Sequence, residues 1–383
     1  MEKVTKVPFN LPHVTGREAE YIERAISGRK LSGDGPFTKA CQELIEQQLG
    51  VGRSLLTTSC TDALEAAAIL CDIEPGDEVI IPSYTFVSSA NPFVQRGATI
   101  RFVDSLADQP NLDHEAVADL VTPRTRAIVP VHYAGVACEM DALIGIARTH
   151  GLMIVEDAAQ GIASTFRGKP LGTLGDLAAF SFHETKNIIS GEGGALHVNR
   201  SDLVARAEII REKGTDRSAF FRGEIDKYGW VDIGSSFLPS ELIAAYLLAQ
   251  LEQIDAIQTQ RIRIWKRYDG RLRAFGNNLG IQMPFVPNYA SNNAHMYYMV
   301  MPSEALRDKI MMFLRTRGIS STFHYQSLHR SKYFEYKHDG RLLTQADRYT
   351  ACLIRLPLYA DMTDDHVDYV ADNIIQFFNE YSR

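Results

Sequence analysis

The chain has 383 residues, of which 45% are hydrophobic and 23% are charged, and its formal net charge is −7. This length allows two domains of ordinary size, and the composition is typical of a globular protein. The acidic balance without a basic run argues against a nucleic-acid-binding surface, and the lack of a long apolar run argues against a membrane span.

Residues 1–10 contain no long apolar stretch, and the five cysteines are scattered without a CxxC pair. We therefore expect no secretory signal, no disulfide framework and no metal site. A reducing, cytoplasmic location is the expectation that follows.

The first part of the chain predicts two amphipathic helices, over 15–27 and 38–49. Thr15 could cap the first, and Glu18 could complete a capping box. A turn-rich loop at 32–36 separates the two helices, and by itself it is a connector.

Residues 51–200 alternate short apolar runs with helical stretches over 62–70 and 137–150. Several runs are continuously apolar, as expected for strands covered on both faces. This pattern predicts an α/β fold with a mostly parallel central sheet, whose ligands bind at the carboxyl ends of the strands. The predicted strands are 54–57, 78–81, 99–103, 127–131, 152–155, 178–182 and 195–198.

Two strand ends in this region carry candidate binding groups. Ser59, Cys60 and Thr61 open an alanine-rich helix, where hydroxyl and backbone donors favour an anion such as phosphate. An ordinary helix cap explains Thr or Ser at such a place more often than a phosphate site does. Tyr84 and Phe86 end another strand and could lie against a flat ring or pack in the core.

An acid and an amine follow two further strands, at Asp157 and Lys186. Alone, each residue could be a turn cap or a solvated side chain. Together, at ends of one sheet, they suit pyridoxal phosphate (PLP). The amine can form a Schiff base with the aldehyde, and the acid can keep the pyridine nitrogen protonated.

The C-terminal part of the sequence changes in pattern. An apolar helix over 240–254 should be buried in the core or in a subunit interface. A charged helix over 258–273 then leads to predicted strands at 296–301 and 320–323, which flank a helix over 303–317. Thr363 should cap the last helix. We therefore predict a large domain, 1–255, and a smaller α+β domain, 256–383.

The combined motifs resemble the DegT-type nucleotide-sugar aminotransferases over essentially the whole chain. The resemblance implies an aspartate-aminotransferase-like fold, PLP fold type I, and a homodimer with shared active sites. The motifs that carry it are Gly33-Asp34-Gly35-Pro36, Thr58-Ser59-Cys60-Thr61, Pro82-Ser83-Tyr84-Thr85-Phe86, Pro130-Val131-His132-Tyr133-Ala134-Gly135, Glu156-Asp157-Ala158-Ala159-Gln160, Ser181-Phe182-His183-Glu184-Thr185-Lys186 and Glu192-Gly193-Gly194.

Within the family, three segments look most like the branch that makes dTDP-4-amino-4,6-dideoxygalactose for enterobacterial-type surface polysaccharides. These segments are 181–187, 211–215 and 232–236. The activity implied is transfer of an amino group from L-glutamate to the 4-keto carbon of dTDP-4-keto-6-deoxyglucose.

The resemblance also implies roles for individual residues. Lys186 would bind the cofactor and later move the proton, and Asp157 would pair with the pyridinium nitrogen. Gln160 would reach the hydroxyl side of the ring, and Phe86 would stack on its face, with Tyr84 as the weaker candidate. The residues implied to hold the phosphate are Ser59, Cys60, Thr61 and Ser181.

One segment departs from the pattern of the family. Many members carry Gly-x-Asn-x-Arg before the long helix, and the Asn reaches the phosphate in the partner subunit. Here Ser236 replaces that Asn and Leu238 replaces the Arg. Ser236 can still donate a hydrogen bond, although its reach is shorter.

Further residues are placed near the sugar nucleotide by the resemblance. They are His324, Tyr325 and His329, and a structural role suits each equally well. Lys213 could neutralise a diphosphate or lie in a solvated charged loop.

Three other functions stay open at this point. The first is amination at carbon 3 or on another nucleotide sugar. The second is a sugar dehydratase of the same fold, against which Lys186 counts because those enzymes carry histidine there. The third is a non-catalytic regulatory relative, which the intact Asp157 and Lys186 pair disfavours.

Overall fold

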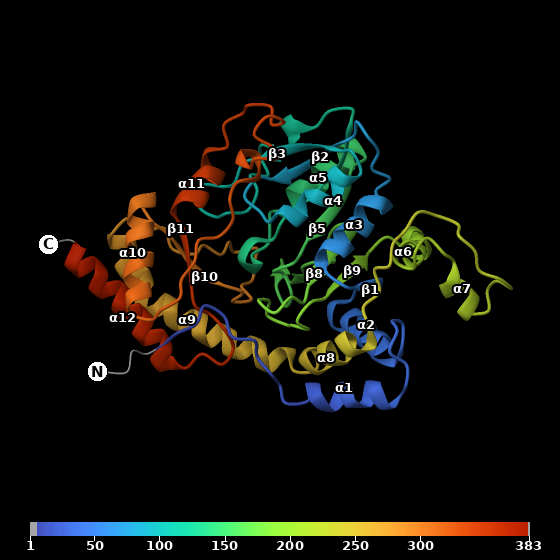
Figure 1. Ribbon diagram of the computed structural model, residues 1–383. Helices are drawn as coiled ribbons and strands as arrows, with labels where there is room; N and C mark the ends of the chain where they lie inside the picture. Colours follow the sequence, from blue (N-terminus) through green and yellow to red (C-terminus); the bar gives the residue numbers. More distant parts are fainter. Residues whose placement is uncertain (1–5, 382–383) are drawn as a thin grey trace.

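The centre of the molecule is a mixed β-sheet. The computed structural model describes residues 6–381, so the ends of the two predicted domains, 1–5 and 382–383, lie outside the described residues. Within 6–381, seven strands pair in the order β1-β9-β8-β5-β4-β2-β3 (Figure 1). The strands are β1 Arg53–Thr57, β2 Glu78–Pro82, β3 Thr99–Val103, β4 Thr125–Ile128, β5 Met153–Asp157, β8 Leu177–Ser181 and β9 Gly194–Val198.

The direction of these strands confirms the expected sheet. The pairs from β3 through β2, β4 and β5 to β8 are parallel. Strand β9 runs antiparallel to both of its neighbours, β8 and β1. The parallel strands therefore end at one edge of the sheet, and the segments that follow them meet there.

Helices cover both faces of the sheet, which explains the continuous apolar runs. Val79 and Ile81 of β2 pack on one face with α3 (Cys60–Leu70) and α4 (Asn91–Gln95). Ile80, which lies between them, packs on the other face with α5 (Met140–His150).

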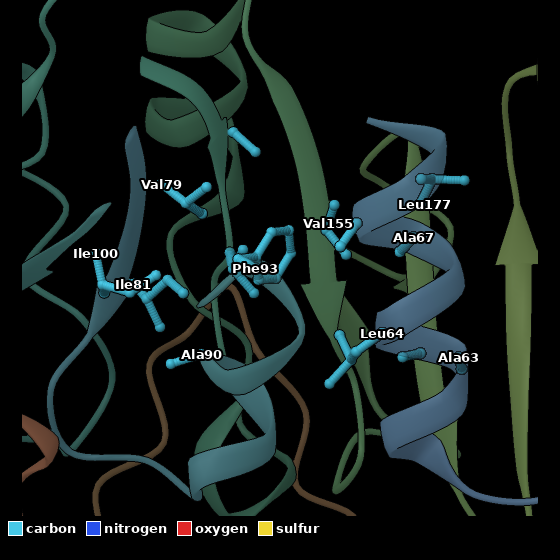
Figure 2. Packing of buried hydrophobic residues seen from close by; sticks show 14 of the residues in the cluster. Ala63, Leu64, Ala67, Val79, Ile81, Ala90, Phe93, Ile100, Val155 and Leu177 are labelled. Carbon is cyan, nitrogen blue, oxygen red and sulfur yellow. The ribbon is translucent and has the colours of Figure 1, made fainter. Parts of the chain in front are cut away.

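The alanine-rich helix α3 lies close against its face of the sheet. Figure 2 shows Ala63, Leu64 and Ala67 on this helix, in one buried cluster with Val155 of β5 and Leu177 of β8. These small side chains let the helix approach the sheet, and burial of Leu64 contributes roughly 1.5–3 kcal/mol to folding. The close approach fixes the position of the amino end of α3 relative to the strand ends.

Three helices cover the face of β1, β8 and β9 that lies opposite α3. They are α1 (Glu18–Ser27), α2 (Pro36–Leu49) and α8 (Glu241–Leu251), and α8 packs against the other two. The apolar surface of α8 is buried in this cluster with Leu56 and Phe180 of the sheet. The prediction that this helix is buried is therefore confirmed.

The C-terminal part of the chain has its own apolar cluster. Helix α9 (Ile254–Asn278) leads from α8 toward a two-stranded antiparallel sheet of β10 and β11 (Figure 1). Val7 packs in the same cluster, so the beginning of the described chain lies with its C-terminal part. The other elements there are β10 Tyr297–Val300, α10 Glu304–Thr316, α11 Thr344–Cys352, β11 Leu353–Leu356 and α12 Asp364–Tyr381.

Four further short elements belong to the described fold. They are β6 Thr165–Phe166, β7 Lys169–Pro170, α6 Val204–Arg211 and α7 Arg217–Phe221. Helix α7 stands away from the layers (Figure 1). In the described part of the chain, no helix combines the length and apolar character needed to cross a membrane.

Two element predictions need correction. Residues 320–323 form no strand, since Thr322 makes only an isolated bridge to Arg355 and the chain then turns along a cavity wall. Strand β4 covers Thr125–Ile128 rather than 127–131, and Pro130, beyond its end, has no N–H for the ladder.

Helices α3 and α5 begin at residues different from those predicted, because capping side chains fix where they start. Ser59 caps α3, which begins at Cys60, and Glu139 caps α5, which begins at Met140. The predicted box at α1 is present in part: Glu18 accepts from the Thr15 backbone N–H (2.8 Å), and the helix begins only at Glu18. Thr363 accepts from the His366 N–H (3.2 Å) at the start of the last helix, as predicted.

A buried carboxylate anchors the loop before α2. Glu241 is 0% exposed, and it accepts hydrogen bonds from the backbone N–H groups of Gly35 (3.1 Å), Phe37 (2.8 Å) and Thr38 (3.1 Å). It thereby satisfies N–H groups that have no partner within the helix. Its negative charge also interacts favourably with the positive end of the helix dipole.

We predict that Glu241→Ala lowers the free energy of unfolding by about 3 kcal/mol, because several buried N–H groups lose their acceptor. Glu20→Ala, which removes only an exposed pairing with Arg24 at 3.8 Å, is the matched control and should change it by less than about 0.5 kcal/mol. Urea unfolding followed by tryptophan fluorescence measures both, and equal effects would contradict the anchoring role.

Candidate active site

A cavity of about 820 Å³ opens at the carboxyl ends of the parallel strands. Its walls come from the segments after β1, β2, β5 and β8, from residues 322–331 and from β11. Both the place and the volume are those of a small-molecule site in an open α/β sheet. The predicted site residues that line it are Ser59, Cys60, Thr61, Phe86, Asp157, Gln160, Ser181, Lys186, His324 and Tyr325.

Asp157 ends β5, is 5% exposed and lines this cavity. Ser89 Oγ donates to its Oδ2 (2.6 Å), and the Ala159 N–H donates to its Oδ1 (3.1 Å). A carboxylate accepts about four hydrogen bonds, so it can still accept one from a group in the cavity. The arrangement suits a fixed partner for a protonated ring nitrogen.

Glu156, the residue before Asp157, fixes this strand end from behind. Its carboxylate is 0% exposed and accepts from the N–H groups of Gly172 (2.9 Å), Leu174 (2.7 Å) and Gly175 (2.7 Å). His132 Nε2 lies 2.9 Å from the same carboxylate.

The His132 ring has a defined tautomer. The Cys138 N–H donates to its Nδ1 (3.2 Å), so Nε2 carries the proton and donates to Glu156. Burial alone would raise the pKa of Glu156, but the hydrogen bond from His132 and those from Gly175 and Gly172 hold that pKa below its usual value. The carboxylate therefore stays charged, and β5 is held in place next to the site.

Lys186 follows β8 and also lines the cavity. Its backbone N–H donates to the His183 carbonyl (2.9 Å), which closes the turn. Asn187 anchors the turn, because its Nδ2 donates to the Asn293 carbonyl (2.8 Å). Burial lowers the pKa of the Lys186 amine, while the charge of Asp157 acts in the opposite direction. A larger fraction of neutral amine is then available as a nucleophile or base.

The amino end of α3 faces the cavity through Ser59, Cys60 and Thr61. Ser59 Oγ accepts from the Asp62 N–H (3.1 Å), so Ser59 is also an ordinary helix cap. Gly194 of β9 lies directly behind, and a Cβ there would stand 2.4 Å from the Cys60 nitrogen. Only glycine permits this close approach, which leaves the helix N–H groups facing the cavity as donors for an anion.

Gln160 and Tyr325 are joined on the cavity wall. The Ala134 N–H donates to Gln160 Oε1 (2.6 Å), and Gln160 Nε2 donates to the Tyr325 hydroxyl (2.9 Å). Phe86 is 55% exposed, and its ring centroid is 6.1 Å from that of Tyr325. His324 stacks on Tyr325 at 3.5 Å between centroids, and burial holds the pKa of His324 well below its usual value.

Four residues singled out in the sequence lie away from the lining of the cavity in the described chain. Tyr84 is 1% exposed and donates to the His324 carbonyl from behind the wall. His329 is 7% exposed, and its Nδ1 forms a hydrogen bond with Ser83 Oγ (2.7 Å). Lys213 and Ser236 are exposed on the segment around α7.

The structure adds wall residues that sequence reasoning missed. His183 and Thr185 could have been predicted from the sequence, because they closely precede Lys186 in the motif Ser181–Lys186. His295 and Arg355 carry no local signal, because they come from the C-terminal part and reach the cavity only through the fold.

Most of the chain matches the model of one known protein family. Residues 12–375 match the model of the DegT/DnrJ/EryC1/StrS aminotransferase family. GDP-perosamine synthase of Caulobacter vibrioides is 32% identical over 376 residues, 97% of this chain and 98% of the relative. The spore coat polysaccharide biosynthesis protein SpsC of Bacillus subtilis is 31% identical over 377 residues, 96% of each chain.

Solved structures agree with this description. The aminotransferase TlmJ of Streptoalloteichus hindustanus superimposes with a TM-score of 0.89 at 27% identity, covering 98% of this chain and 100% of that one. The protein Spr1654 of Streptococcus pneumoniae in its PLP form gives a TM-score of 0.86 at 25% identity, covering 96% of this chain and 97% of that one. The α/β fold of type I expected from the sequence is confirmed.

The cavity residues fit PLP. Asp157 is a fixed carboxylate for the ring nitrogen, and Lys186 is an amine with a lowered pKa. The N–H groups that Gly194 leaves accessible at α3 suit the phosphate. The cavity therefore offers a matching group for the ring nitrogen, the aldehyde and the phosphate of the cofactor.

We predict that Glu156→Gln lowers the melting temperature by about 5 °C at neutral pH, because the amide cannot satisfy the four N–H groups that the carboxylate accepts. The pKa of Glu156 is lower in the folded state, so its contribution is full above the ordinary value of about 4.5 and is lost as the pH falls further.

The difference in melting temperature between wild type and Glu156→Gln should accordingly shrink below about pH 4.5. Scanning fluorimetry across a pH series measures it, with the exposed Glu115→Gln as control. A difference that grows on acidification would contradict the hydrogen-bonded, charged Glu156.

Proposed function

The chain belongs to the DegT/DnrJ/EryC1/StrS aminotransferase family and is a PLP-dependent sugar aminotransferase; from this premise we propose its reaction. L-Glutamate donates an amino group that is transferred to the 4-keto carbon of dTDP-4-keto-6-deoxyglucose, giving dTDP-4-amino-4,6-dideoxygalactose for surface polysaccharide synthesis. The observation that carries the proposal is that Asp157 and Lys186 face one cavity large enough for a cofactor and a sugar.

The proposed roles of the chain's residues follow from their positions. PLP supplies an aldehyde that carries the amino group and a ring that accepts electrons. Lys186 would hold the cofactor through its amine and, once released, would move the proton at the reacting carbon, for which its lowered pKa is suited. Asp157 would keep the ring nitrogen protonated, and Phe86, which lines the cavity and is 55% exposed, would cover the ring face.

The remaining cofactor contacts are proposed in the same way. Ser59, Cys60 and Thr61 line the cavity at the amino end of α3, and Ser181 lines it at the end of β8. Together these four residues would hold the phosphate. Gln160 reaches the hydroxyl side of the ring, where its amide is already oriented by Ala134.

We propose that the sugar binds beside His324 and Tyr325, which line the cavity on the wall contributed by residues 322–331. Tyr325 has a left-handed backbone (φ 55°), a strained conformation that the fold holds at this wall. Tyr84 and His329 support the wall from behind, through the His324 carbonyl and Ser83.

A second candidate substrate is a GDP-linked 4-keto sugar. It is favoured by the 32% identity to a relative named GDP-perosamine synthase. The dTDP sugar is preferred because the segments 181–187, 211–215 and 232–236 resemble the branch that uses it. The name of SpsC supports a polysaccharide role for either product.

We further propose a homodimer in which each subunit completes the other's site. Helix α7 and its flanking loop stand away from the rest of the fold (Figure 1). They expose Phe221 (70%), Tyr228 (51%) and Trp230 (84%), an apolar surface that is unusual for a free monomer. Lys213 and Ser236 lie on the same segment and would reach the partner's site.

Purified enzyme should convert dTDP-4-keto-6-deoxyglucose and L-glutamate to the 4-amino sugar, identified by NMR of the product. Lys186→Ala should abolish turnover and the visible absorbance of a lysine-bound cofactor, whereas the exposed Lys169→Ala should retain both. Activity surviving in Lys186→Ala would refute the assigned role.

The same assay decides between substrates. A GDP-linked 4-keto sugar and a dTDP-linked 3-keto sugar are tested in parallel, and we expect the dTDP-4-keto sugar to give the highest kcat/KM by at least about 10-fold, roughly 1.4 kcal/mol of discrimination. A preference for either competitor would replace the proposed substrate and leave the aminotransferase chemistry intact.

Light scattering should give a mass of about twice the 42.8 kDa of one chain. Trp230→Glu should shift the protein toward monomer and lower activity, because a charge replaces an apolar contact. The exposed Tyr336→Glu is the control, since Tyr336 (90% exposed) lies on the C-terminal part. A wild-type monomer with full activity would exclude shared sites.

A further inference from the structure

One histidine in the wall of the cavity has a ring nitrogen without a partner. His295 lies two residues before β10, lines the cavity and is 4% exposed. Its Nδ1 is 2.9 Å from Asn187 Oδ1, whereas no residue of the described chain forms a hydrogen bond with its Nε2. The position of the ring proton decides what Nε2 can bind.

The contacts of Asn187 fix the tautomer of His295. Asn187 Nδ2 donates to the Asn293 carbonyl (2.8 Å) and to Gln258 Oε1 (2.9 Å). Because a carbonyl can only accept, the amide nitrogen of Asn187 must face it, and the amide oxygen faces His295. Nδ1 of His295 therefore carries the proton and donates to Asn187, which leaves a free lone pair on Nε2.

The imidazole of His295 also stays neutral. Burial holds its pKa well below the usual value, and three nearby cations act in the same direction. These cations are Lys186, Arg355 and Arg261. A neutral ring protonated at Nδ1 accepts a hydrogen bond at Nε2 and cannot donate one there.

The backbone of His295 holds the ring in place. Its N–H donates to Asn293 Oδ1 (3.0 Å), and its carbonyl accepts from Arg261 Nη2 (2.8 Å). Asn293 in turn donates to the carbonyls of Gln160 (2.7 Å) and Ile162 (2.8 Å). The acceptor is thus fixed beside the turn of the reacting lysine before a ligand binds, so binding orders little.

Two other buried histidines of the described chain differ from His295. His132 uses both of its ring nitrogens in hydrogen bonds. His197 uses neither, but it stacks on Phe180 in the core (4.5 Å between centroids) and does not line the cavity. His295 combines one bonded nitrogen with a free one at a cavity. Since buried acceptors are normally satisfied, the missing partner of Nε2 is expected to be a ligand.

A trapped water is a poor substitute for that ligand. The ring of His295 also borders a void of about 10 Å³ next to Phe9 and Asn10. This volume is at the lower limit for one water, which also needs two or more polar partners. The large cavity is therefore the side from which a donor reaches Nε2.

An acceptor at this place selects among the groups that the substrates carry. Carboxylates, the diphosphate and the keto oxygen are acceptors themselves, so none of them can bind Nε2. The amino group of the donor reacts at the cofactor, which leaves the hydroxyls of the sugar. Because His295 bonds the residue that follows Lys186, the hydroxyl that fits is on the carbon next to the reacting carbonyl.

We infer that Nε2 of His295 accepts a hydrogen bond from this hydroxyl, so that His295 is a specificity-determining residue for hydroxylated keto sugars. The inference rests on the proposed function, since it requires a keto sugar as amino acceptor. It does not depend on the nucleotide, because a dTDP-linked or GDP-linked 4-keto sugar can equally carry a hydroxyl on carbon 3.

The test compares dTDP-4-keto-6-deoxyglucose with its 3-deoxy analogue in the PLP-loaded enzyme. Stopped-flow absorbance follows loss of the pyridoxal form with L-glutamate, and its recovery with each keto sugar. Two variants separate the ring nitrogens. His295→Asn keeps an amide donor near the place of Nδ1 and removes the acceptor, whereas His295→Gln puts an amide oxygen near the place of Nε2. His150→Asn, at an exposed histidine that ends α5, is the matched control.

Wild type should prefer the hydroxylated sugar by about 30-fold in kcat/KM, because the analogue leaves a buried acceptor unpaired. In His295→Asn the preference should fall below about 3-fold, while the rate with L-glutamate stays within about 3-fold of wild type. His295→Gln should keep a preference above about 10-fold, at lower absolute rates, since its bond to Asn187 is lost.

Two readouts are independent of turnover. The pyridoxamine form cannot react with an amine, and calorimetry should show that it binds the amino-sugar product about 10-fold more tightly than the 3-deoxy product. His295→Asn should bind the two alike. In ¹⁵N NMR of histidine-labelled wild type, the Nε2 resonance that is lost in His295→Gln should be that of an unprotonated nitrogen, and it should shift only with the hydroxylated product.

The opposite results are equally clear. A wild type that uses both sugars alike would overturn the inference without any variant. Loss of the preference in His295→Gln but not in His295→Asn would show that only the bond to Asn187 matters, and it would overturn the inference too. So would an equal loss of both half-reactions in His295→Asn.

Failure of the proposed substrate is a separate result. If wild type aminates the GDP-linked 4-keto sugar and not the dTDP-linked one, the proposed substrate fails, and the same comparison with the GDP-linked 3-deoxy sugar decides the inference. If wild type aminates neither sugar, the proposed function and the inference both fail.

Discussion

The site depends on one electrostatic constraint, a carboxylate and an amine held in the same buried cavity. Asp157 is fixed by Ser89 and the Ala159 N–H, and Lys186 has its pKa lowered by burial. In a low-dielectric cavity both effects are stronger than they would be in water. The acid can therefore keep a cofactor ring protonated while the amine stays reactive.

This constraint is maintained by the layers behind the cavity. Glu156 accepts hydrogen bonds from three backbone N–H groups and from the His132 ring. The end of β5 therefore cannot shift without leaving these buried donors unpaired. Gly194 lets α3 come against β9, which places the helix dipole at the cavity. Core packing and buried polar contacts thus serve the geometry of the site as well as the stability of the fold.

The cavity also carries charges of both signs. Asp157 and Glu192 line it with carboxylates, and Lys186 and Arg355 line it with cations. His324 and His295 are kept neutral by burial, since the pKa of each is well below its usual value.

The sequence by itself determined the sheet, its strand ends and the local motifs. Asp157, Lys186 and the start of α3 could be predicted because each follows an apolar strand, and parallel strands end together. Only the tertiary structure decided which of the remaining candidates reach the cavity. Tyr84 and His329 lie behind the wall, whereas Arg355, far along the chain and without a motif, lies on it. The hydrophobic period and the composition of a segment predict the helix or strand in which a residue lies. Contacts between distant elements depend on how those elements pack, which no local pattern encodes.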